Sequence, residues 1–261
     1  MQLTGHITED KVMALYLGSL PLEEQQRLHR HVADCIGCSR EYELYREIMS
    51  GVETLVQGMA GTYDEDLLRT SIRQKMRTRQ IYYDLMHHPL VGPLWLAVSH
   101  AGVCLVEFAD RTPFEIEERL KTLQPEAWLT LNKSQTSNVI AELRAYFNQE
   151  LSKFSFAIDW RLVPAGFMRS VLEVVSRIPY GHVFTYGDIA DRIGKPKSVR
   201  AVGQALGANP MPIVVPCHRV VAKGGKLGGF SAGLHLKKKL LELEGVRWPN
   251  FSQQMDFFSR R

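Results

Sequence analysis

Residues 211–221 read Met211-Pro212-Ile213-Val214-Val215-Pro216-Cys217-His218-Arg219-Val220-Val221, and this stretch decides how the sequence is interpreted. It places one thiol and two cationic side chains between two apolar runs, so the segment is expected to be mostly buried. Burial normally leaves a cysteine inert, whereas a neighbouring imidazole and a positive field favour the thiolate, which is the nucleophile. A buried structural thiol is the simpler interpretation of Cys217, but apolar surroundings rarely include a histidine and an arginine side by side.

The flanking sequence extends this pattern in both directions. Three further motifs are SVRAVGQALGANP at 198–210, GGFSAG at 228–233 and LEG at 243–245. With these motifs in this order, the chain resembles the O6-alkylguanine-DNA alkyltransferases, closely from about Phe167 to Trp248 and more weakly from about residue 82 to 160. The resemblance implies a suicide repair protein, which moves an alkyl group from guanine O6 or thymine O4 in DNA onto its own cysteine, here Cys217.

The resemblance also implies a proton relay around the thiol. In it, Glu244 orients His218, and His218 deprotonates Cys217 through a bridging water, which is the logic of a hydrolase triad with a longer proton path. Consecutive side chains of an extended segment point to opposite faces, and this disfavours direct contact between Cys217 and His218. Asn209 braces the turn beside the cysteine and also suits a helix end before proline. The helix dipole disfavours a carboxylate near a helix C-terminus, so Glu244 needs a partner, which His218 supplies.

Other residues carry over from the family as DNA contacts. The resemblance implies that Tyr186 contacts the phosphate 3′ of the lesion and helps to protonate the base, and that Arg200 enters the base stack in place of the flipped guanine. Ser231 presents donors towards O6, and the main-chain carbonyl groups of Cys217 and Val220 accept from the exocyclic amine. The family binds the minor groove with few base-specific contacts, which suits a lesion that can occur in any sequence.

Two departures from the family pattern concern the pocket. Phe230, which walls the pocket, stands where many relatives have tyrosine, and therefore lacks a hydroxyl. Ala232 stands where glycine is usual in the glycine-rich segment 228–233, which forms the lid of the pocket. Its methyl group narrows this lid or restricts the φ angle of residue 232. Both departures leave the nucleophile in place and make the range of accepted alkyl groups an open question.

Composition and charge agree with a globular DNA-binding protein. The chain of 261 residues, with 45% hydrophobic and 23% charged residues, has room for two or three domains. No apolar run approaches the roughly 18 residues of a membrane span. The N-terminus shows no basic region followed by an apolar stretch, as a signal peptide would, so we expect a cytoplasmic protein.

The net charge of +4 is unevenly distributed, because residues 161–248 hold 14 Lys and Arg against 5 Asp and Glu. This fits a phosphate backbone, although a solvated face with the lysines of 237–239 explains part of it.

The hydrophobic periodicity predicts an α+β protein with three folded parts. Residues 1–57 read as short helices, with Thr8 as the N-cap of the first and Ser39 as the N-cap of the third. Residues 58–81 read as a linker with a helical second part. The N-terminal part is therefore expected to be a small all-α domain.

Residues 82–162 combine a β pattern with helices. The expected elements are a hairpin over 94–98 and 103–108, helices near 113–123 and 135–149, and a strand over 154–158. This part resembles the ribonuclease-H-like α/β domain of the alkyltransferases, which serves there as a scaffold.

Residues 163–250 change to a helical period, and residues 251–261 form a tail. Two helices are expected in succession, one over 186–193 capped by Thr185 and one over 199–206 capped by Ser198. Such a pair is typical of a helix–turn–helix, and the alkyltransferase resemblance makes it part of a winged-helix-like helical DNA-binding domain.

An N-terminal motif predicts a metal site. In the stretch HVADCIGC, His31 and Cys35 share one helix face, and the following turn brings Cys38 back to the same point. His6 could complete a tetrahedral Zn²⁺ site, with His29 as its competitor, and a closed site with four ligands would be structural. A redox dithiol and two free thiols are the alternatives.

The segment over about residues 5–55 resembles the zinc-binding domain of anti-sigma factors, which has the same short helices and an upstream histidine as fourth ligand. This resemblance implies a sigma factor or another protein as a partner of the N-terminal domain. The remaining cysteines, Cys104 among apolar neighbours and Cys217, stand alone. Four cysteines without a disulfide framework suit a reducing compartment.

These observations predict a DNA repair protein that accepts one alkyl group per molecule and binds double-stranded DNA around a flipped alkylguanine. The expected zinc is structural, and the transfer itself needs no cofactor. The competing hypothesis is a zinc-dependent transcription regulator or alkylation sensor that uses the same fold for DNA binding. The combination of Cys217, His218 and Glu244 favours chemistry, because binding alone needs no nucleophile.

Overall fold

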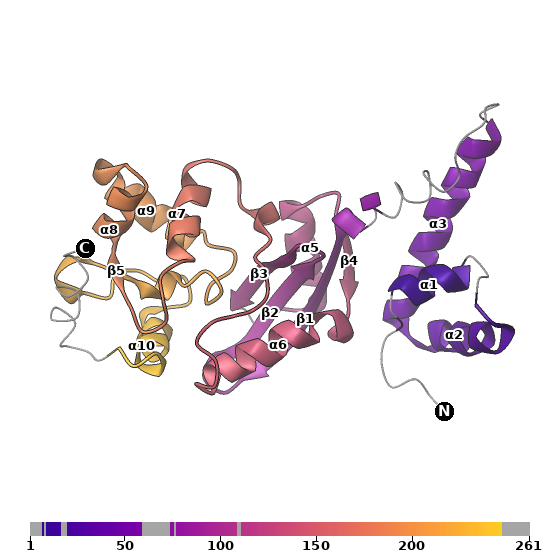
Figure 1. Cartoon of the computed structure of the whole chain (residues 1–261), viewed down its shortest axis with the longest axis horizontal. Coiled ribbons are helices and arrows are strands. Elements are labelled where there is room, and N and C mark those ends of the chain that lie inside the picture. Colours follow the sequence, from indigo (N-terminus) through magenta and orange to yellow (C-terminus); the bar gives the residue numbers. More distant parts are fainter. Residues whose placement is uncertain are drawn as a thin grey trace. The chain divides into compact units, whose positions relative to one another are not determined.

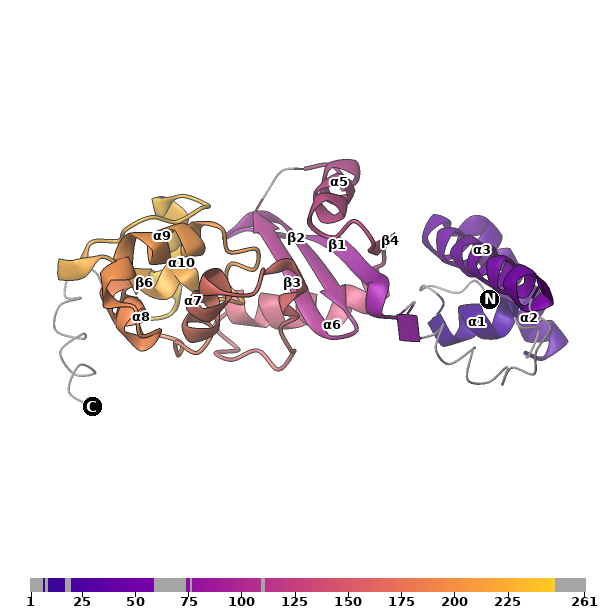
Figure 2. The ribbon, with the colours of Figure 1, turned by 90° about the horizontal axis from the view of Figure 1, so that it is seen from above.

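The computed structural model describes residues 7, 9–16, 20–58, 74–75, 77–108 and 111–246 (Figures 1 and 2). The chain divides into two compact units, Met1–Asp84 with Glu126–Thr136, and Leu85–Pro125 with Ser137–Arg261. Within the described ranges, no helix is long and apolar enough to cross a membrane.

Three helices open the first unit, α1 (Glu9–Tyr16), α2 (Leu22–Asp34) and α3 (Ile36–Gly58). Their shared core consists of Ile7, Val12, Leu15, Leu28, Val32, Cys38 and Tyr45, with Trp128 packed against it. The predicted N-cap at Ser39 is wrong, because the Ser39 amide already donates a helical hydrogen bond to the Cys35 carbonyl oxygen (2.8 Å). Thr8, the predicted N-cap of the first helix, lies outside the described residues.

Two strands of the sheet were not predicted. β1 (Gln80–His88) lies where the linker was expected to end, and it pairs in parallel with β4 (Trp128–Leu131). The first five residues of β1 are all buried, so its sequence lacks the alternation that marks a strand with one exposed face.

The predicted hairpin is confirmed as β2 (Gly92–Ser99) and β3 (Gly102–Phe108), which pair antiparallel, and the four strands have the order β3-β2-β1-β4. The predicted helices are α5 (Pro113–Leu123) and α6 (Lys133–Phe147). A capping box between Thr112 and Glu115 fixes the start of α5.

The predicted strand over 154–158 is wrong, because only Ile158 forms an isolated bridge, to Val103. The chain there follows the edge of β3, where the Val103 amide donates to the Ala157 carbonyl oxygen (2.9 Å). The approach is so close that a Cβ on Gly102 would lie 2.1 Å from that oxygen. Further along β3, the Val106 amide donates to the Pro210 carbonyl oxygen (2.8 Å), which ties the loop before Cys217 to the sheet.

The C-terminal part is helical, with α7 (Phe167–Val175), α8 (Tyr186–Arg192), α9 (Val199–Gly207) and α10 (Leu234–Leu243), and a small parallel pair of β5 (Phe184–Thr185) with β6 (Val220–Val221). Thr185 and Asp188 form the capping box that begins α8, as predicted for Thr185. Ser198 occupies the N-cap position of α9, but its side chain makes no capping hydrogen bond. Helices α7, α8 and α9 contact one another, which gives the expected helix–turn–helix.

Candidate active site

Cys217 begins a single 3₁₀ turn, Cys217–Arg219, at the end of a buried loop. The prediction that this segment is extended is wrong, because the Arg219 amide donates a hydrogen bond to the Pro216 carbonyl oxygen (2.9 Å), which closes the turn. Asn209 braces the loop, since its Nδ2 donates to the Val215 carbonyl oxygen (2.9 Å) and to Cys217 Sγ (3.3 Å). The loop also holds Ile213 at φ +75°, a strained conformation for a β-branched residue.

His218 and Glu244 form a fully buried pair at the end of α10. His218 Nε2 lies 2.9 Å from Glu244 Oε1, and neither side chain is exposed. Arg219 donates from Nε and Nη2 to the same carboxylate at 2.8–3.1 Å, and the Gly181 amide donates to Oε2 (3.1 Å). The sequence suggested that Arg219 would act on the Cys217 thiol. Its guanidinium group instead binds the Glu244 carboxylate.

The charges in this pair follow from its partners. Burial alone would raise the pKa of Glu244, but hydrogen bonds and charges from His218 and Arg219 lower that pKa to about 2. Burial lowers the pKa of His218 below its ordinary value. Because Arg219 is permanently charged, Glu244 is ionised and His218 is neutral near pH 7. His218 Nδ1 is buried and has no hydrogen-bond partner among the described residues, so it is free to take a proton.

Lys237 supplies a positive charge that acts on the thiol. Burial raises the pKa of Cys217, while the Asn209 amide and the charge of Lys237 act in the opposite direction. Lys237 is itself fully buried, which lowers its pKa to about 8, and its Nζ donates to the Val220 and Gly229 carbonyl oxygens. The expectation that this lysine belongs to a solvated face is wrong.

Tyr186, at the start of α8, contacts the glycine-rich lid. The Gly229 amide donates to its hydroxyl oxygen (3.1 Å), and burial raises its pKa. A Cβ on Gly228, which has φ +67°, would lie 2.7 Å from that ring, so the lid closes over Tyr186 only with glycine there. The ring of Phe230 meets His218 edge to face, with centroids 6.5 Å apart.

The remaining predicted DNA contacts lie at the surface. Arg200 is an exposed residue in the first turn of α9, and Ser231 is exposed in the turn before α10. Val220 is buried, and its carbonyl group already accepts from Lys237, which leaves one lone pair for another donor.

Comparisons with known proteins agree with this geometry. Two family models match, "6-O-methylguanine DNA methyltransferase, ribonuclease-like domain" over residues 81–160 and "6-O-methylguanine DNA methyltransferase, DNA binding domain" over residues 166–246. A methylated-DNA–protein-cysteine methyltransferase of Methanosarcina acetivorans is 40% identical over 167 residues, which are 63% of this chain and 99% of that protein. The chain belongs to the 6-O-methylguanine DNA methyltransferase family.

Further relatives come from Mycobacterium tuberculosis. Its methylated-DNA–protein-cysteine methyltransferase is 38% identical over 169 residues, 65% of this chain and 95% of that protein. The crystal structure of M. tuberculosis OGT in complex with DNA aligns with a TM-score of 0.53 at 35% identity, over 67% of this chain and 99% of that chain. The two matched domains begin at residue 81, so neither covers the N-terminal helices.

Sequence reasoning missed two polar side chains of this methyltransferase site. Lys237 could have been found, since it lies three and four residues before the buried Leu240 and Leu241 on the apolar side of α10. Tyr146, in the last turn of α6, donates from its hydroxyl to Glu244 Oε1 (2.6 Å). No local pattern marks Tyr146, because its partner is 98 residues away in the sequence.

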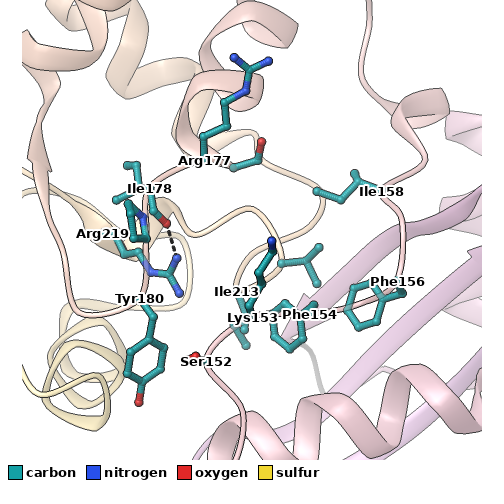
Figure 3. A pocket seen from close by; sticks show the side chains of 13 residues that line it. Ser152, Lys153, Phe154, Phe156, Ile158, Arg177, Ile178, Tyr180, Ile213 and Arg219 are labelled. Carbon is teal, nitrogen blue, oxygen red and sulfur yellow. Dashed lines mark hydrogen bonds between the residues drawn. The ribbon is translucent and has the colours of Figure 1, made fainter.

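A cavity of about 730 Å³ adjoins the Arg219 side of the relay. Its lining comes from Ser152, Lys153, Phe154, Phe156 and Ile158, from residues 176–180, and from Ile213, Val214 and Arg219. Figure 3 shows Arg219 hydrogen-bonded to the Ile178 carbonyl group at one wall, with Phe154 and Phe156 at another. Neither Cys217 nor His218 lines this cavity, so it is not the pocket in which an alkylated base would meet the thiol.

The structure also brings the N-terminal metal candidates together. The ligand atoms of His31, Cys35 and Cys38 lie within 4.8 Å of one another and could hold a metal ion. His31 Nε2 is buried and has no hydrogen-bond partner among the described residues, as expected of an atom reserved for a metal. The predicted fourth ligand, His6, lies outside the described residues, while the competitor His29 is exposed.

Proposed function

We propose that this methyltransferase repairs O6-alkylguanine, and O4-alkylthymine, by transferring the alkyl group to Cys217, once per molecule. The observation that supports this most is the buried thiol beside a buried imidazole whose orientation a carboxylate fixes. A DNA-binding regulator has no use for such an arrangement, because a buried ion pair with a neutral histidine is costly to build without a chemical role.

The transfer is a displacement at carbon. His218 Nδ1 takes the thiol proton of Cys217 through one bridging water, as the family resemblance implies. The Sγ thiolate attacks the alkyl carbon in line with the bond to O6, an S–C bond forms, and the C–O6 electron pair stays with guanine. Tyr186 donates its hydroxyl proton to the departing base, so that guanine leaves neutral, and the proton that His218 took from the thiol replaces the one lost by Tyr186.

Access to O6 requires that the base leave the duplex. We assign Arg200 on α9 to the gap in the base stack, and Phe230, Ser231 and the Val220 carbonyl group to the pocket that receives the base. The relative from M. tuberculosis was crystallised in complex with DNA, which supports DNA as the partner here.

The decisive test is where the methyl group goes. After incubation with duplex DNA that contains O6-methylguanine, the peptide with Cys217 should gain about 14 Da, and the peptide with Cys104 should not. Burial raises the pKa of Cys104 to about 12, so that thiol is a poor nucleophile. Cys217→Ala should lose transfer but keep DNA binding. Transfer that survives in Cys217→Ala would refute the assignment.

For the N-terminal domain we propose a structural Zn²⁺ held by His31, Cys35, Cys38 and His6. The set of two thiolates and imidazoles suits zinc, which would hold together helices whose shared core is small. Ile7, the sequence neighbour of His6, donates its amide to Cys38 Sγ (3.3 Å), and this supports His6 as the fourth ligand.

The same domain is proposed to bind a protein partner, of the sigma-factor type that the anti-sigma resemblance suggests. Leu22 and Ile36 support this role, since 71% and 76% of these apolar residues are exposed near the starts of α2 and α3.

A further inference from the structure

Tyr146 reaches the proton relay from the ribonuclease-like domain. It lies in the last turn of α6, is 1% exposed, and is enclosed by the rings of Phe147, Phe154 and Tyr180 at centroid distances of 5.4, 5.4 and 6.0 Å. Its hydroxyl donates to Glu244 Oε1 at 2.6 Å, and the Tyr146 hydroxyl oxygen also lies 3.4 Å from His218 Nε2.

These two distances determine which atom of His218 carries the proton. A phenol has one proton, and the short bond commits it to Glu244. The Tyr146 oxygen therefore presents a lone pair to Nε2, and Glu244 Oε1 presents another at 2.9 Å. With acceptors on both sides, Nε2 must carry the hydrogen, so Nδ1 is the unprotonated nitrogen.

We propose that Tyr146 is a positioning residue of the relay, which holds Glu244 in place and keeps His218 in the tautomer whose free Nδ1 can accept the proton of Cys217. The inference rests on the proposed alkyl transfer. It gives the ribonuclease-like domain a part in the chemistry of the thiol, beyond its role as a scaffold.

The direction of the expected effect follows from the groups that face His218. These are Lys237 on α10, Glu244 directly after that helix, Arg219 beside His218 in the 3₁₀ turn, and Tyr146 on α6. Loss of the Tyr146 hydroxyl removes one donor from Glu244, so the carboxylate would attract a proton on His218 more strongly. The loss of the weaker 3.4 Å contact opposes this, but the 2.6 Å bond is the stronger interaction. The imidazole should therefore protonate at higher pH without the hydroxyl.

The test is the pH profile of methyl transfer for the full chain and Tyr146→Phe. Below its pKa a base is protonated and inactive, so the acid limb of the variant should move to higher pH. We expect a shift of half a unit to one unit, which is a loss in rate that approaches roughly three- to tenfold at pH values well below the pKa of His218 and is less than about twofold at pH 8.5. The matched control is Tyr180→Phe, which removes a hydroxyl that donates to the Leu243 carbonyl oxygen and not to the carboxylate.

Other outcomes separate the two proposals. If the wild-type chain transfers no methyl group, the proposed function fails. If the wild-type chain transfers the methyl group but Tyr146→Phe has the wild-type pH profile, only the proposed role of Tyr146 fails. The same holds if Tyr146→Phe loses rate equally at every pH and also loses thermal stability. Nitrogen NMR of His218 in the wild-type chain tests the inference even if the variant does not fold. A protonated Nε2 with bare Nδ1 supports it, and the opposite tautomer overturns it.

Discussion

Lys237 is the first of three consecutive lysines, yet it is fully buried while Lys238 is exposed. The charge of its ammonium group lowers the pKa of Cys217. We therefore expect Lys237→Met to raise the pKa of the thiol and to slow methyl transfer by roughly tenfold or more, since one pKa unit changes the thiolate fraction tenfold. The measurement is the pH dependence of Cys217 alkylation by iodoacetamide, beside the rate of methyl transfer.

Lys238→Met is the control for this change. Lys238 makes an exposed ion pair with Glu242 (3.6 Å), which contributes little to stability, so its variant should behave as the wild type. Lys237→Met should also lose about 1–3 kcal/mol of stability, because two carbonyl groups lose their donor. A slower variant whose thiol titrates as in the wild type would mean that Lys237 only holds the lid and does not act on the thiol.

The residue scale also shows which site residues could be predicted. Cys217, His218 and Glu244 stand in motifs of a few adjacent residues, so their identity was available from the sequence. The contacts were not, because the 3₁₀ turn at Cys217 and the placement of Arg219 on Glu244 depend on tertiary packing. Tyr146 was unavailable for the same reason, since its carboxylate partner lies in another domain.

At the scale of elements, α9 is the part that we expect to enter DNA. Arg200 lies exposed in its first turn. Arg200→Ala should slow repair of duplex DNA by roughly tenfold or more and leave reaction with the free base O6-benzylguanine within about twofold, because only the duplex must be unstacked. Lys197→Ala is the matched control, since it removes an equal charge from the turn before α9 and should weaken binding without affecting extrusion.

Rates on the two substrates separate the explanations for Arg200. Equal slowing of both would show that Arg200 supports the fold, and equal slowing in Lys197→Ala on duplex DNA would show that charge alone is responsible.

Elements were predictable where local chemistry decides them. The start of α5 follows from a capping box and that of α8 from a second one, and the hairpin of β2 and β3 follows from two apolar runs around a glycine turn. β1 was missed because its leading residues are buried on both faces, and residues 154–158 were mistaken for a strand because alternation also occurs in a segment that only follows a sheet edge.

At the scale of the whole molecule, the chain combines a methyltransferase with a helical N-terminal domain, and we expect about one Zn²⁺ per chain. Cys38→Ser should abolish zinc binding, because it removes a buried ligand from a cluster that has no spare donor within the described residues. The N-terminal helices should loosen with it, since metal binding and folding are coupled in such small domains. His29→Ala is the control, as this exposed histidine of α2 contacts the ring of Tyr42 and should leave the zinc content unchanged.

Methyl transfer by Cys38→Ser then decides whether the two functions are separate. All residues proposed for the transfer lie in the second compact unit, whereas the metal candidates lie in the first. We therefore expect a transfer rate within about twofold of the wild type after zinc is lost, because independent sites affect each other little. Metal analysis and single-turnover kinetics on the same preparation measure both properties. Zinc that persists in Cys38→Ser would refute the ligand set. Zinc loss accompanied by a large fall in transfer rate would instead mean that the N-terminal domain supports the catalytic domains.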